Sequence, residues 1–391
     1  MFRSVLIRGF FLVLVLATTA AVFGADVVRT TAALSQARSR LAATSADGKV
    51  FFAGGNTANG PSAVVDIFDT ASQQWSTATL SQPRYDLSAT SVGDKVIFAG
   101  GNNGSSASKV VDIYDTATGI WSATTLSYAR LGLAATSVGQ QAIIAGGNGV
   151  GDSAWQNLSN RGTVDMYDAA ANTWTPTTFS FFGGERQYLA ATTVGSKAMF
   201  AGGDWGGGAN SRVDVYDSNT DTWSYSYPLG TYREGLAAVT VGNKAIFAGG
   251  IPLGYSQKLV DIFNNQTNSW SHITALSVER SYLAGASIGD LAIFAGGRAG
   301  SVNTAAVDIY DDGTGDWSTT SLSQARCFLA GTSCGDQAFF AGGVTTGFSS
   351  GYTDRVDIVT LVPEPSTLIL LGAGAVGLLG LAWRRRRHSA G

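Results

Sequence analysis

One stretch of the sequence decides the fold: residues 84–121, which read RYDLSATSVGDKVIFAGGNNGSSASKVVDIYDTATGIW. It contains four landmarks in a fixed order, namely an arginine (Arg84), a double glycine (Gly100-Gly101), a Val-Asp pair (Val111-Asp112) and a tryptophan (Trp121). The first three occur seven times along the chain in this order, and the tryptophan occurs six times. Such units cannot bury their apolar faces alone and must pack against one another.

The interval between successive units is 46 to 56 residues, with a mean of 48. The double glycines begin at Gly54, Gly100, Gly146, Gly202, Gly249, Gly296 and Gly342. The arginines are Arg38, Arg84, Arg130, Arg186, Arg233, Arg280 and Arg326. The Val-Asp pairs begin at Val65, Val111, Val164, Val213, Val260, Val307 and Val356, and the tryptophans are Trp75, Trp121, Trp174, Trp223, Trp270 and Trp317. Intervals of this length with these landmarks predict a β-propeller or a related array.

Each unit reads as four short strands. In the second unit, Leu87–Val92 and Lys95–Ala99 are joined by Gly93-Asp94, whose leading glycine suits a type II′ hairpin. The first unit has Asp47-Gly48 at the same place, which suits type I′ instead. A fourth strand begins at each tryptophan, such as Trp121, and we expect that side chain to be buried and to contribute about 2–3 kcal/mol.

These landmarks resemble the kelch repeat, in which an apolar strand ends in Gly-Gly and an aromatic-Asp pair such as Tyr114-Asp115 precedes a tryptophan by six residues. The resemblance extends over about residues 26–360 and implies an all-β fold, a seven-bladed kelch-type β-propeller. Two units depart from the pattern. Asn264 replaces the aspartate in the fifth, and the seventh ends at residues 356–360 with neither the aromatic-Asp pair nor the tryptophan.

The incomplete seventh unit predicts how the ring closes. Residues 29–38 match residues 75–84 in register, so they form a fourth strand that precedes the first unit. Pairing of this N-terminal strand with the seventh unit closes the ring and removes its open edges. Arg29 stands where a tryptophan is expected, so we expect this blade to be the least well packed.

Residues 1–24 have the features of a signal peptide. Arg3 and Arg8 precede an apolar run, and small residues follow it. We favour cleavage after Gly24, with Ala21 as the rival position and a retained membrane anchor as the alternative. The propeller is then expected over residues 25–361.

The C-terminal segment, residues 362–391, has three parts. A Pro-rich motif at 362–367 contains Pro363, Glu364 and Pro365. Residues 368–383 are apolar and uncharged, and at 1.5 Å per residue they extend about 24 Å, short of the ~30 Å hydrocarbon core but within a workable range. The tail at 384–391 begins with four arginines, which should stay cytoplasmic and leave the body of the chain on the other side.

This tail closely resembles the PEP-CTERM sorting signal, which has a Pro-Glu-Pro motif, one membrane helix and a short basic tail. The resemblance implies a bacterial protein that is exported across the inner membrane and anchored there by its C-terminal helix. An exosortase, a membrane peptidase, would cut near Pro363, Glu364 and Pro365. The processed protein would then be found at the cell surface or outside the cell, in the exopolysaccharide matrix.

Composition excludes several functions. The only histidines are His272 and His388, and the only cysteines are Cys327 and Cys334, so a metal site, a disulfide scaffold and a copper-radical oxidase are not expected. We predict no cofactor, and both cysteines read as small buried residues. Asp311–Asp316 faintly suggests a calcium loop, but turn chemistry explains it better. A sequence pI near 5.4 excludes nucleic acid as an expected partner.

The repeated arginines start the first strand of every unit and should therefore encircle the axis on one face. One interpretation is an anion-binding mouth made by Arg38, Arg84, Arg130, Arg186, Arg233, Arg280 and Arg326. The alternative, which we favour, is a ladder of Arg–Asp pairs with the Val-Asp series, because scaffolding repeats in every blade while a binding site is local.

Asymmetry between units is therefore a better guide to a binding site. The repeat is irregular around units three and four, where unit three has a long loop at residues 148–162. We expect the aromatic residues of these loops and of the connections that follow them on one face of adjacent blades: Trp155, Trp205, Phe181, Phe182, Tyr227 and Tyr232. Exposed aromatic rings suit stacking on sugars or on a protein partner. Packing under the enlarged loops is the alternative.

We predict a non-catalytic binding or structural module of the bacterial cell surface or exopolysaccharide matrix, with an exosortase and a carbohydrate or another envelope protein as partners. Residues 25–361 contain 19 basic and 27 acidic residues, which argues against an acidic polysaccharide. The alternative is a sugar epimerase or mutarotase that uses the arginines with Glu185, Glu234 and Glu279.

Overall fold

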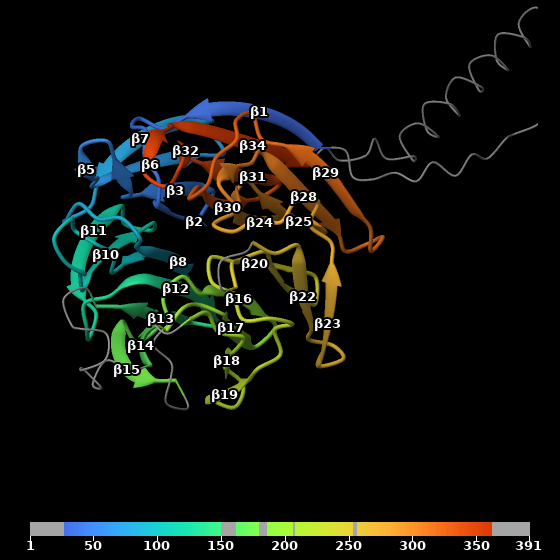
Figure 1. The fold of residues 1–391 in the computed structure, drawn as a ribbon. Helices are drawn as coiled ribbons and strands as arrows, with labels where there is room; N and C mark the ends of the chain where they lie inside the picture. Colours follow the sequence, from blue (N-terminus) through green and yellow to red (C-terminus); the bar gives the residue numbers. More distant parts are fainter. Residues whose placement is uncertain (1–26, 150–161, 180–185, 206–207, 253–255, 362–391) are drawn as a thin grey trace, which may run out of the picture. The chain divides into compact units, whose positions relative to one another are not determined.

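The computed structural model describes residues 27–149, 162–179, 186–205, 208–252 and 256–361. In this part of the chain there are seven sheets of four antiparallel strands and no helix. The sheets follow one another round a ring in chain order (Figure 1). The first strands of neighbouring sheets contact each other all the way round, so they are the innermost strands. The prediction of an all-β, seven-bladed propeller is confirmed.

Each of the first three blades is a sheet of four strands that follow one another from the axis outward. Blade 1 contains β2 (Ala42–Ala46), β3 (Lys49–Ala53), β6 (Val64–Asp69) and β7 (Gln74–Thr79). Blade 2 contains β8 (Ser88–Val92), β9 (Lys95–Ala99), β10 (Val110–Asp115) and β11 (Ile120–Thr125). Blade 3 contains β12 (Leu131–Val138), β13 (Gln141–Asn148), β14 (Thr163–Asp168) and β15 (Thr173–Thr178).

Blades 4 to 6 repeat this pattern. Blade 4 contains β16 (Ala190–Val194), β17 (Lys197–Ala201), β18 (Val213–Asp217) and β19 (Thr222–Ser226). Blade 5 contains β20 (Ala237–Val241), β21 (Lys244–Ala248), β22 (Leu259–Asn264) and β23 (Ser269–Thr274). Blade 6 contains β24 (Ala284–Ile288), β25 (Leu291–Ala295), β28 (Ala306–Asp311) and β29 (Trp317–Ser321).

Blade 7 is built from both ends of the ring. It contains β30 (Ala330–Cys334), β31 (Gln337–Ala341), β34 (Arg355–Leu361) and, as its outermost strand, β1 (Val27–Ala33). Strands β1 and β34 are antiparallel, with Val27 opposite Leu361 and Ala33 opposite Arg355. Figure 1 shows them side by side, although they are far apart in the sequence. The predicted closure by the N-terminal strand is therefore present.

Three adjacent blades carry a small ribbon in the loop between their second and third strands. The ribbons pair β4 (Asn56–Thr57) with β5 (Gly60–Pro61), β26 (Arg298–Ala299) with β27 (Val302–Asn303), and β32 (Val344–Thr346) with β33 (Ser350–Tyr352). They belong to blades 1, 6 and 7.

The turns between first and second strands have the predicted conformations. Asp47 and Gly48 both have positive φ, as a type I′ turn requires. In Gly93-Asp94 only the glycine has positive φ, as type II′ requires. These hairpins lie on the opposite face from the loops between the second and third strands.

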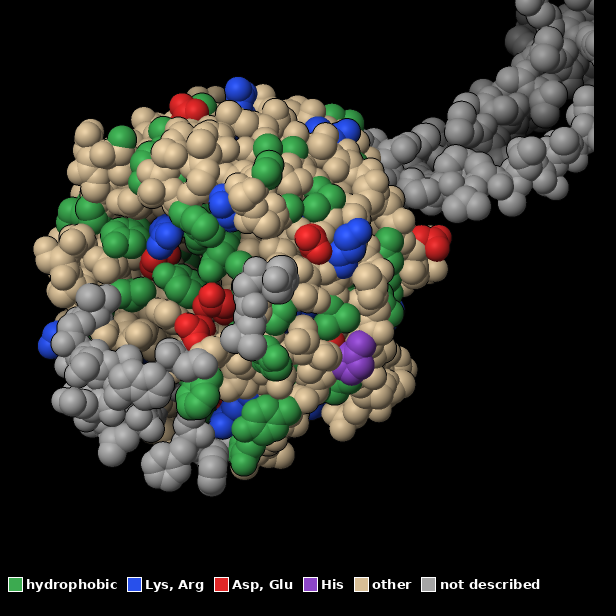
Figure 2. Space-filling model, in the orientation of Figure 1, with side chains coloured by type: hydrophobic (Ala, Val, Ile, Leu, Met, Phe, Trp, Pro, Cys, Tyr) green, Lys and Arg blue, Asp and Glu red, His purple; other side chains and the backbone are tan. Residues whose placement is uncertain are grey.

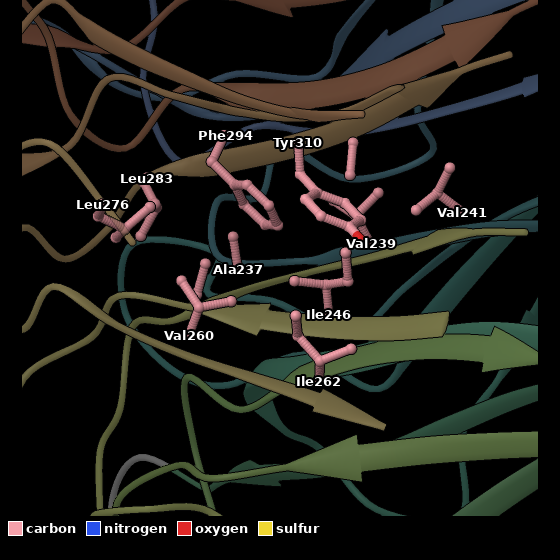
Figure 3. Close-up of a cluster of buried hydrophobic side chains, with 12 residues drawn as sticks. Ala237, Val239, Val241, Ile246, Val260, Ile262, Leu276, Leu283, Phe294 and Tyr310 are labelled. Carbon is pink, nitrogen blue, oxygen red and sulfur yellow. The ribbon is translucent and has the colours of Figure 1, made fainter. Parts of the chain in front are cut away.

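The hydrophobic core lies between the blades. A cluster between blades 5 and 6, for example, joins Val260 and Ile262 of β22 to Phe294 of β25 and Tyr310 of β28 (Figure 3). Alanines such as Ala237 on the innermost strand let the blades approach closely near the axis. Because every such cluster belongs to two blades, no blade has a complete core of its own.

The tryptophans differ from the prediction, because they are half-buried rather than buried. Trp121 opens the outermost strand of blade 2, where it packs on Tyr114 with ring centroids 5.0 Å apart, and its outer edge faces solvent. Arg29 of blade 7 makes a polar contact instead, since its Nη1 donates to the carbonyl of Ser321 in blade 6 at 2.9 Å. An outermost strand has no further strand to cover it.

Among the described residues there is no helix that could cross a membrane by its length and apolar character. The expected signal peptide at 1–24 and the expected helix at 368–383 lie outside those residues.

Candidate functional site

The repeated arginines are buried, and each makes an ion pair with the aspartate of the Val-Asp pair in its own blade. The pairs are Arg38–Asp66, Arg84–Asp112, Arg130–Asp165, Arg186–Asp214, Arg233–Asp261, Arg280–Asp308 and Arg326–Asp357. Both side chains of every pair are at least nine-tenths buried. The arrangement is the Arg–Asp ladder rather than an open anion-binding mouth.

Each pair fixes the chain that arrives from the preceding blade. In blade 1, Arg38 donates to Asp66 and to the carbonyl of Phe52 on β3, and the backbone N–H of Ser35 donates to the other oxygen of Asp66 at 3.0 Å. Burial lowers the pKa of each arginine, in Arg186 to about 10, so the nearby aspartate is needed to keep the guanidinium charged. The ladder is structural.

A second ring of residues lies two positions after the arginines and encircles the axis. All seven have left-handed backbones, with φ between 52° and 65°: Arg40, Asp86, Gly132, Tyr188, Gly235, Tyr282 and Phe328. The backbone N–H of each donates to the carbonyl of the corresponding residue in the preceding blade, at 2.7–3.1 Å. The seven hydrogen bonds form a closed circle, which we call the axial ring.

The axial ring surrounds a pocket of about 270 Å³. The leucines that follow its members line it as well: Leu41, Leu87, Leu133, Leu189, Leu236, Leu283 and Leu329. Figure 2 shows hydrophobic, basic and acidic side chains meeting round this hollow in the middle of the face. Its volume lies just below the roughly 300–1,000 Å³ of typical ligand pockets, so it suits a small ligand.

One side of the pocket is charged. Arg40 donates through Nη1 to Asp86 Oδ2 at 3.0 Å, and the Tyr188 hydroxyl reaches the same oxygen at 3.5 Å. Burial raises the pKa of Asp86 above its ordinary value, and Arg40 offsets only part of that effect. Burial and the charge of Asp86 raise the pKa of Tyr188, so its hydroxyl stays a donor.

An aromatic cluster adjoins the ion pair, since the guanidinium of Arg40 lies 4.4 Å from the ring centre of Phe328. The rings of Tyr282 and Phe328 lie 4.5 Å apart at an angle of 32°, and Tyr188 meets Tyr282 edge to face at 6.2 Å. Two glycines of the axial ring make room for these tyrosines. A Cβ on Gly235 would lie 2.8 Å from the ring of Tyr282, and one on Gly132 would lie 3.5 Å from the ring of Tyr188.

Two further groups stand at the rim. The hydroxyl of Tyr282 donates to Glu234 Oε1 at 3.3 Å, and burial together with Asp204 raises the pKa of Glu234. Phe348, in the turn between β32 and β33, packs on Phe328 with centroids 5.7 Å apart. The pocket thus has an aromatic wall, an ion pair beside that wall and a carboxylate at its edge.

Three of the predicted aromatic residues are exposed. The exposed fraction is 50% for Trp205, 45% for Tyr232 and 61% for Tyr227, all of which lie on or beside blade 4 on the pocket face. Trp155, Phe181 and Phe182 lie outside the described residues.

The glutamates of the enzyme hypothesis lie apart from its arginines. Glu185 is outside the described residues, and Glu279 is exposed on the link into blade 6. Glu234 reaches the pocket rim, but its neighbour Arg233 is buried on Asp261.

Other candidate chemistry finds little support. Cys327 and Cys334 are not bonded to each other. Both were predicted to be buried; Cys327 is buried, whereas Cys334 is half-buried. Asp311 accepts hydrogen bonds from the backbone of Gly313 and Thr314, which is turn chemistry. In the described part of the chain no three His, Cys, Asp or Glu side chains are grouped to hold a metal ion.

Sequence reasoning missed the axial ring. Its position always lies between the repeated arginine and the repeated leucine, yet it holds five different residue types. A variable position inside an otherwise uniform motif was the available signal. Loop length drew attention to blades 3 and 4, whereas the pocket takes a residue from every blade.

The fold and the pocket define a seven-bladed β-propeller with an opening for a small ligand at one end of its axis. Family models described as the kelch motif match residues 37–79 and 83–124, which are the first two units. A model described as the PEP-CTERM protein-sorting motif matches residues 361–387. No curated protein matches the chain.

The chain therefore contains a seven-bladed β-propeller whose first two units match the kelch motif, followed by a PEP-CTERM sorting motif. The sorting motif indicates an exported protein that an exosortase processes. Both resemblances seen in the sequence are confirmed.

Proposed function

We propose that this protein is a non-catalytic binding module of the bacterial cell surface or exopolysaccharide matrix, and that its central pocket binds a sugar ring. It is exported by a signal peptide at residues 1–24 and held on the inner membrane by the helix at 368–383 until an exosortase cuts near Pro363–Pro365. The observation that carries the proposal is the pocket, in which aromatic rings and an ion pair lie side by side.

The groups in the pocket match the two kinds of surface of a pyranose. The C–H face of a sugar ring is apolar and stacks on an aromatic ring such as that of Tyr282. Its hydroxyl groups donate and accept hydrogen bonds at once. Asp86 offers acceptor oxygens and Arg40 offers donors, and they are held side by side at 3.0 Å.

The Arg–Asp ladder supports the proposal of a neutral sugar, because it removes the repeated arginines as binding groups for an acidic one. Because the seven repeated arginines are consumed by structural ion pairs, they offer no charge to a ligand. The charges that line the pocket, Arg40 and Asp86, neutralise each other, and Glu234 adds a carboxylate at the rim. A neutral sugar fits this balance better than an acidic one.

A glycan array and titration calorimetry on the exported, processed protein test the proposal. We expect binding of neutral glycans, with affinity reduced at least tenfold in Tyr282→Ala and Asp86→Ala. Glu279→Gln, which changes an exposed residue on the link into blade 6, is the matched control and should bind normally. Absence of glycan binding by the folded protein would contradict the proposal.

A second candidate, a sugar mutarotase or epimerase, rests on a separate observation. Asp86 and Glu234 are two carboxyl groups with raised pKa values beside one sugar-sized pocket, which is an arrangement that acid–base catalysis can use. A polarimetric mutarotation assay distinguishes the two functions. Turnover that is lost in Glu234→Gln favours the enzyme, and binding without turnover favours the binding module.

A further inference from the structure

Exposed aromatic side chains gather on blade 4 and on the link that leaves it. Trp205, Tyr225, Tyr227 and Tyr232 are four of the nine large hydrophobic side chains that are exposed among the described residues. The corresponding outer-strand positions in blade 3 hold Pro176 and Thr178 in place of Tyr225 and Tyr227. The aromatic surface is therefore particular to one sector of the ring.

This surface begins where the rim of the pocket ends. Asp204, which precedes Trp205, exchanges two backbone hydrogen bonds of 2.9 Å with Gln187, the neighbour of Tyr188 in the axial ring. Tyr232 lies two residues before Glu234, and Glu234 accepts a hydrogen bond from Tyr282 in the pocket. The backbone of blade 4 thus connects the pocket to the exposed aromatic side chains without a break.

Tyr225 and Tyr227, which lie at the outer end of this surface, are held in place by each other and by Arg212. Tyr225 and Tyr227 meet edge to face with centroids 6.1 Å apart, and the buried guanidinium of Arg212 lies 4.1 Å from the ring centre of Tyr225. Arg212 in turn donates to Asp214, the aspartate of this blade's ladder pair. A cation against an aromatic ring holds that ring in place.

We infer that the pocket is the inner end of an elongated site for a chain of several neutral sugar residues, which runs outward over blade 4. The inference rests on the proposed sugar-binding function and extends it from one ring to a polymer. A pocket of about 270 Å³ holds one ring, and the exposed aromatic side chains provide stacking faces for the next ones. Glu234 lies between the two parts, so an acidic polymer is disfavoured.

The test compares affinities for oligosaccharides of increasing length. The probes are neutral glucose and mannose oligomers of one to six residues, and galacturonate oligomers of the same lengths, titrated into the exported, processed protein. We expect affinity for one of the neutral series to rise with length, and the acidic series to bind more weakly at every length. The double variant Trp205→Ala, Tyr227→Ala should lose about tenfold or more with the long neutral oligomers and nothing with the monomer.

Ile120→Ala is the matched control, because Ile120 is 63% exposed but lies on the opposite face. Monomer binding without any gain from length, or a length dependence that the double variant keeps, would overturn the elongated site and leave the pocket standing. Binding of neither neutral series would overturn both the elongated site and the sugar-binding function. Preference for galacturonate would overturn the neutral class.

Discussion

The Arg–Asp ladder and the axial ring are neighbouring layers of the same seven blades, separated by two residues of sequence. In the ladder every blade has the same pair, both members are buried, and the contacts repeat. In the axial ring the backbone repeats with φ between 52° and 65°, while the side chains are arginine, aspartate, glycine, tyrosine and phenylalanine. Repetition therefore marks what holds the blades, and variation at a fixed backbone position marks what lines the pocket.

The difference has an energetic basis. A buried charge without its partner costs several kcal/mol, so no blade can change one member of a ladder pair alone. In the axial ring the backbone hydrogen bonds satisfy the polar groups of the main chain whatever the side chain is. Side chains there are restricted mainly by the left-handed backbone, which costs a non-glycine residue on the order of 1 kcal/mol.

The largest effect on stability should come from removing β1, the strand that closes the ring. Deletion of residues 25–36 removes β1, which pairs with β34 along its whole length, and Leu34, which is buried in the core between blades 7 and 1. We expect loss of the cooperative thermal transition measured by circular dichroism. Deletion of residues 362–391, which follow β34, is the control and should leave the transition unchanged; the same result for both deletions would refute the closure.

Breaking one ladder pair should have the next largest effect. Arg84→Leu leaves Asp112 buried without its partner and should lower the free energy of unfolding by about 3–5 kcal/mol. The double variant Arg84→Leu, Asp112→Leu should lose less, because no uncompensated charge remains. Urea unfolding measures both, and a single variant that costs under about 1 kcal/mol would show that the ladder resembles a surface ion pair.

Changing the axial ring should affect binding rather than folding. Tyr282→Gly places at this position the residue that two other blades already have there, Gly132 and Gly235. The lost packing is partly offset by relief of the left-handed tyrosine, so we expect the free energy of unfolding to change by no more than about 1 kcal/mol. Sugar affinity should fall about tenfold. A much larger loss of stability in this variant would mean that the side chains of the axial ring also hold the fold together.

The smallest effect should come from pH. Burial raises the pKa of Asp86, so its carboxylate takes up a proton at a higher pH than an ordinary aspartate, whose pKa is about 3.9. Sugar affinity should therefore fall as the pH is lowered through that raised pKa, and it should be constant above it. Titration calorimetry at several pH values measures this, and Asp86→Asn should bind more weakly and show no such fall.

Much of the scaffold could be predicted because its chemistry repeats. The double glycines fixed the number of blades, and the match of residues 29–38 to 75–84 identified the closing strand. Gly93-Asp94 and Asp47-Gly48 identified their hairpins, since a two-residue turn restricts the sign of φ. The burial of tryptophans such as Trp121 was overestimated because a repeat pattern does not show that the outermost strand is covered on one side only.

The pocket could not be predicted in the same way. A left-handed tyrosine, phenylalanine or arginine contradicts local backbone preference, so Tyr282, Phe328 and Arg40 gave no sign that they turn toward the axis. Their contacts also join blades that are distant in the sequence, as Tyr188 and Asp86 are. Trp205, Tyr227 and Tyr232 were singled out because the repeat is irregular near their blade, and the structure shows that all three are exposed.

The direction of the closing strands decides which side of the molecule stays accessible. Third strands run away from the pocket face, and β34 is a third strand, so the ring ends at Leu361 on the far face. Val27, which starts β1, lies opposite Leu361. Both ends of the described ring, Val27 and Leu361, therefore lie on the face opposite the pocket. The residues that precede Val27 and those that follow Leu361 are therefore joined to the ring at points away from the pocket.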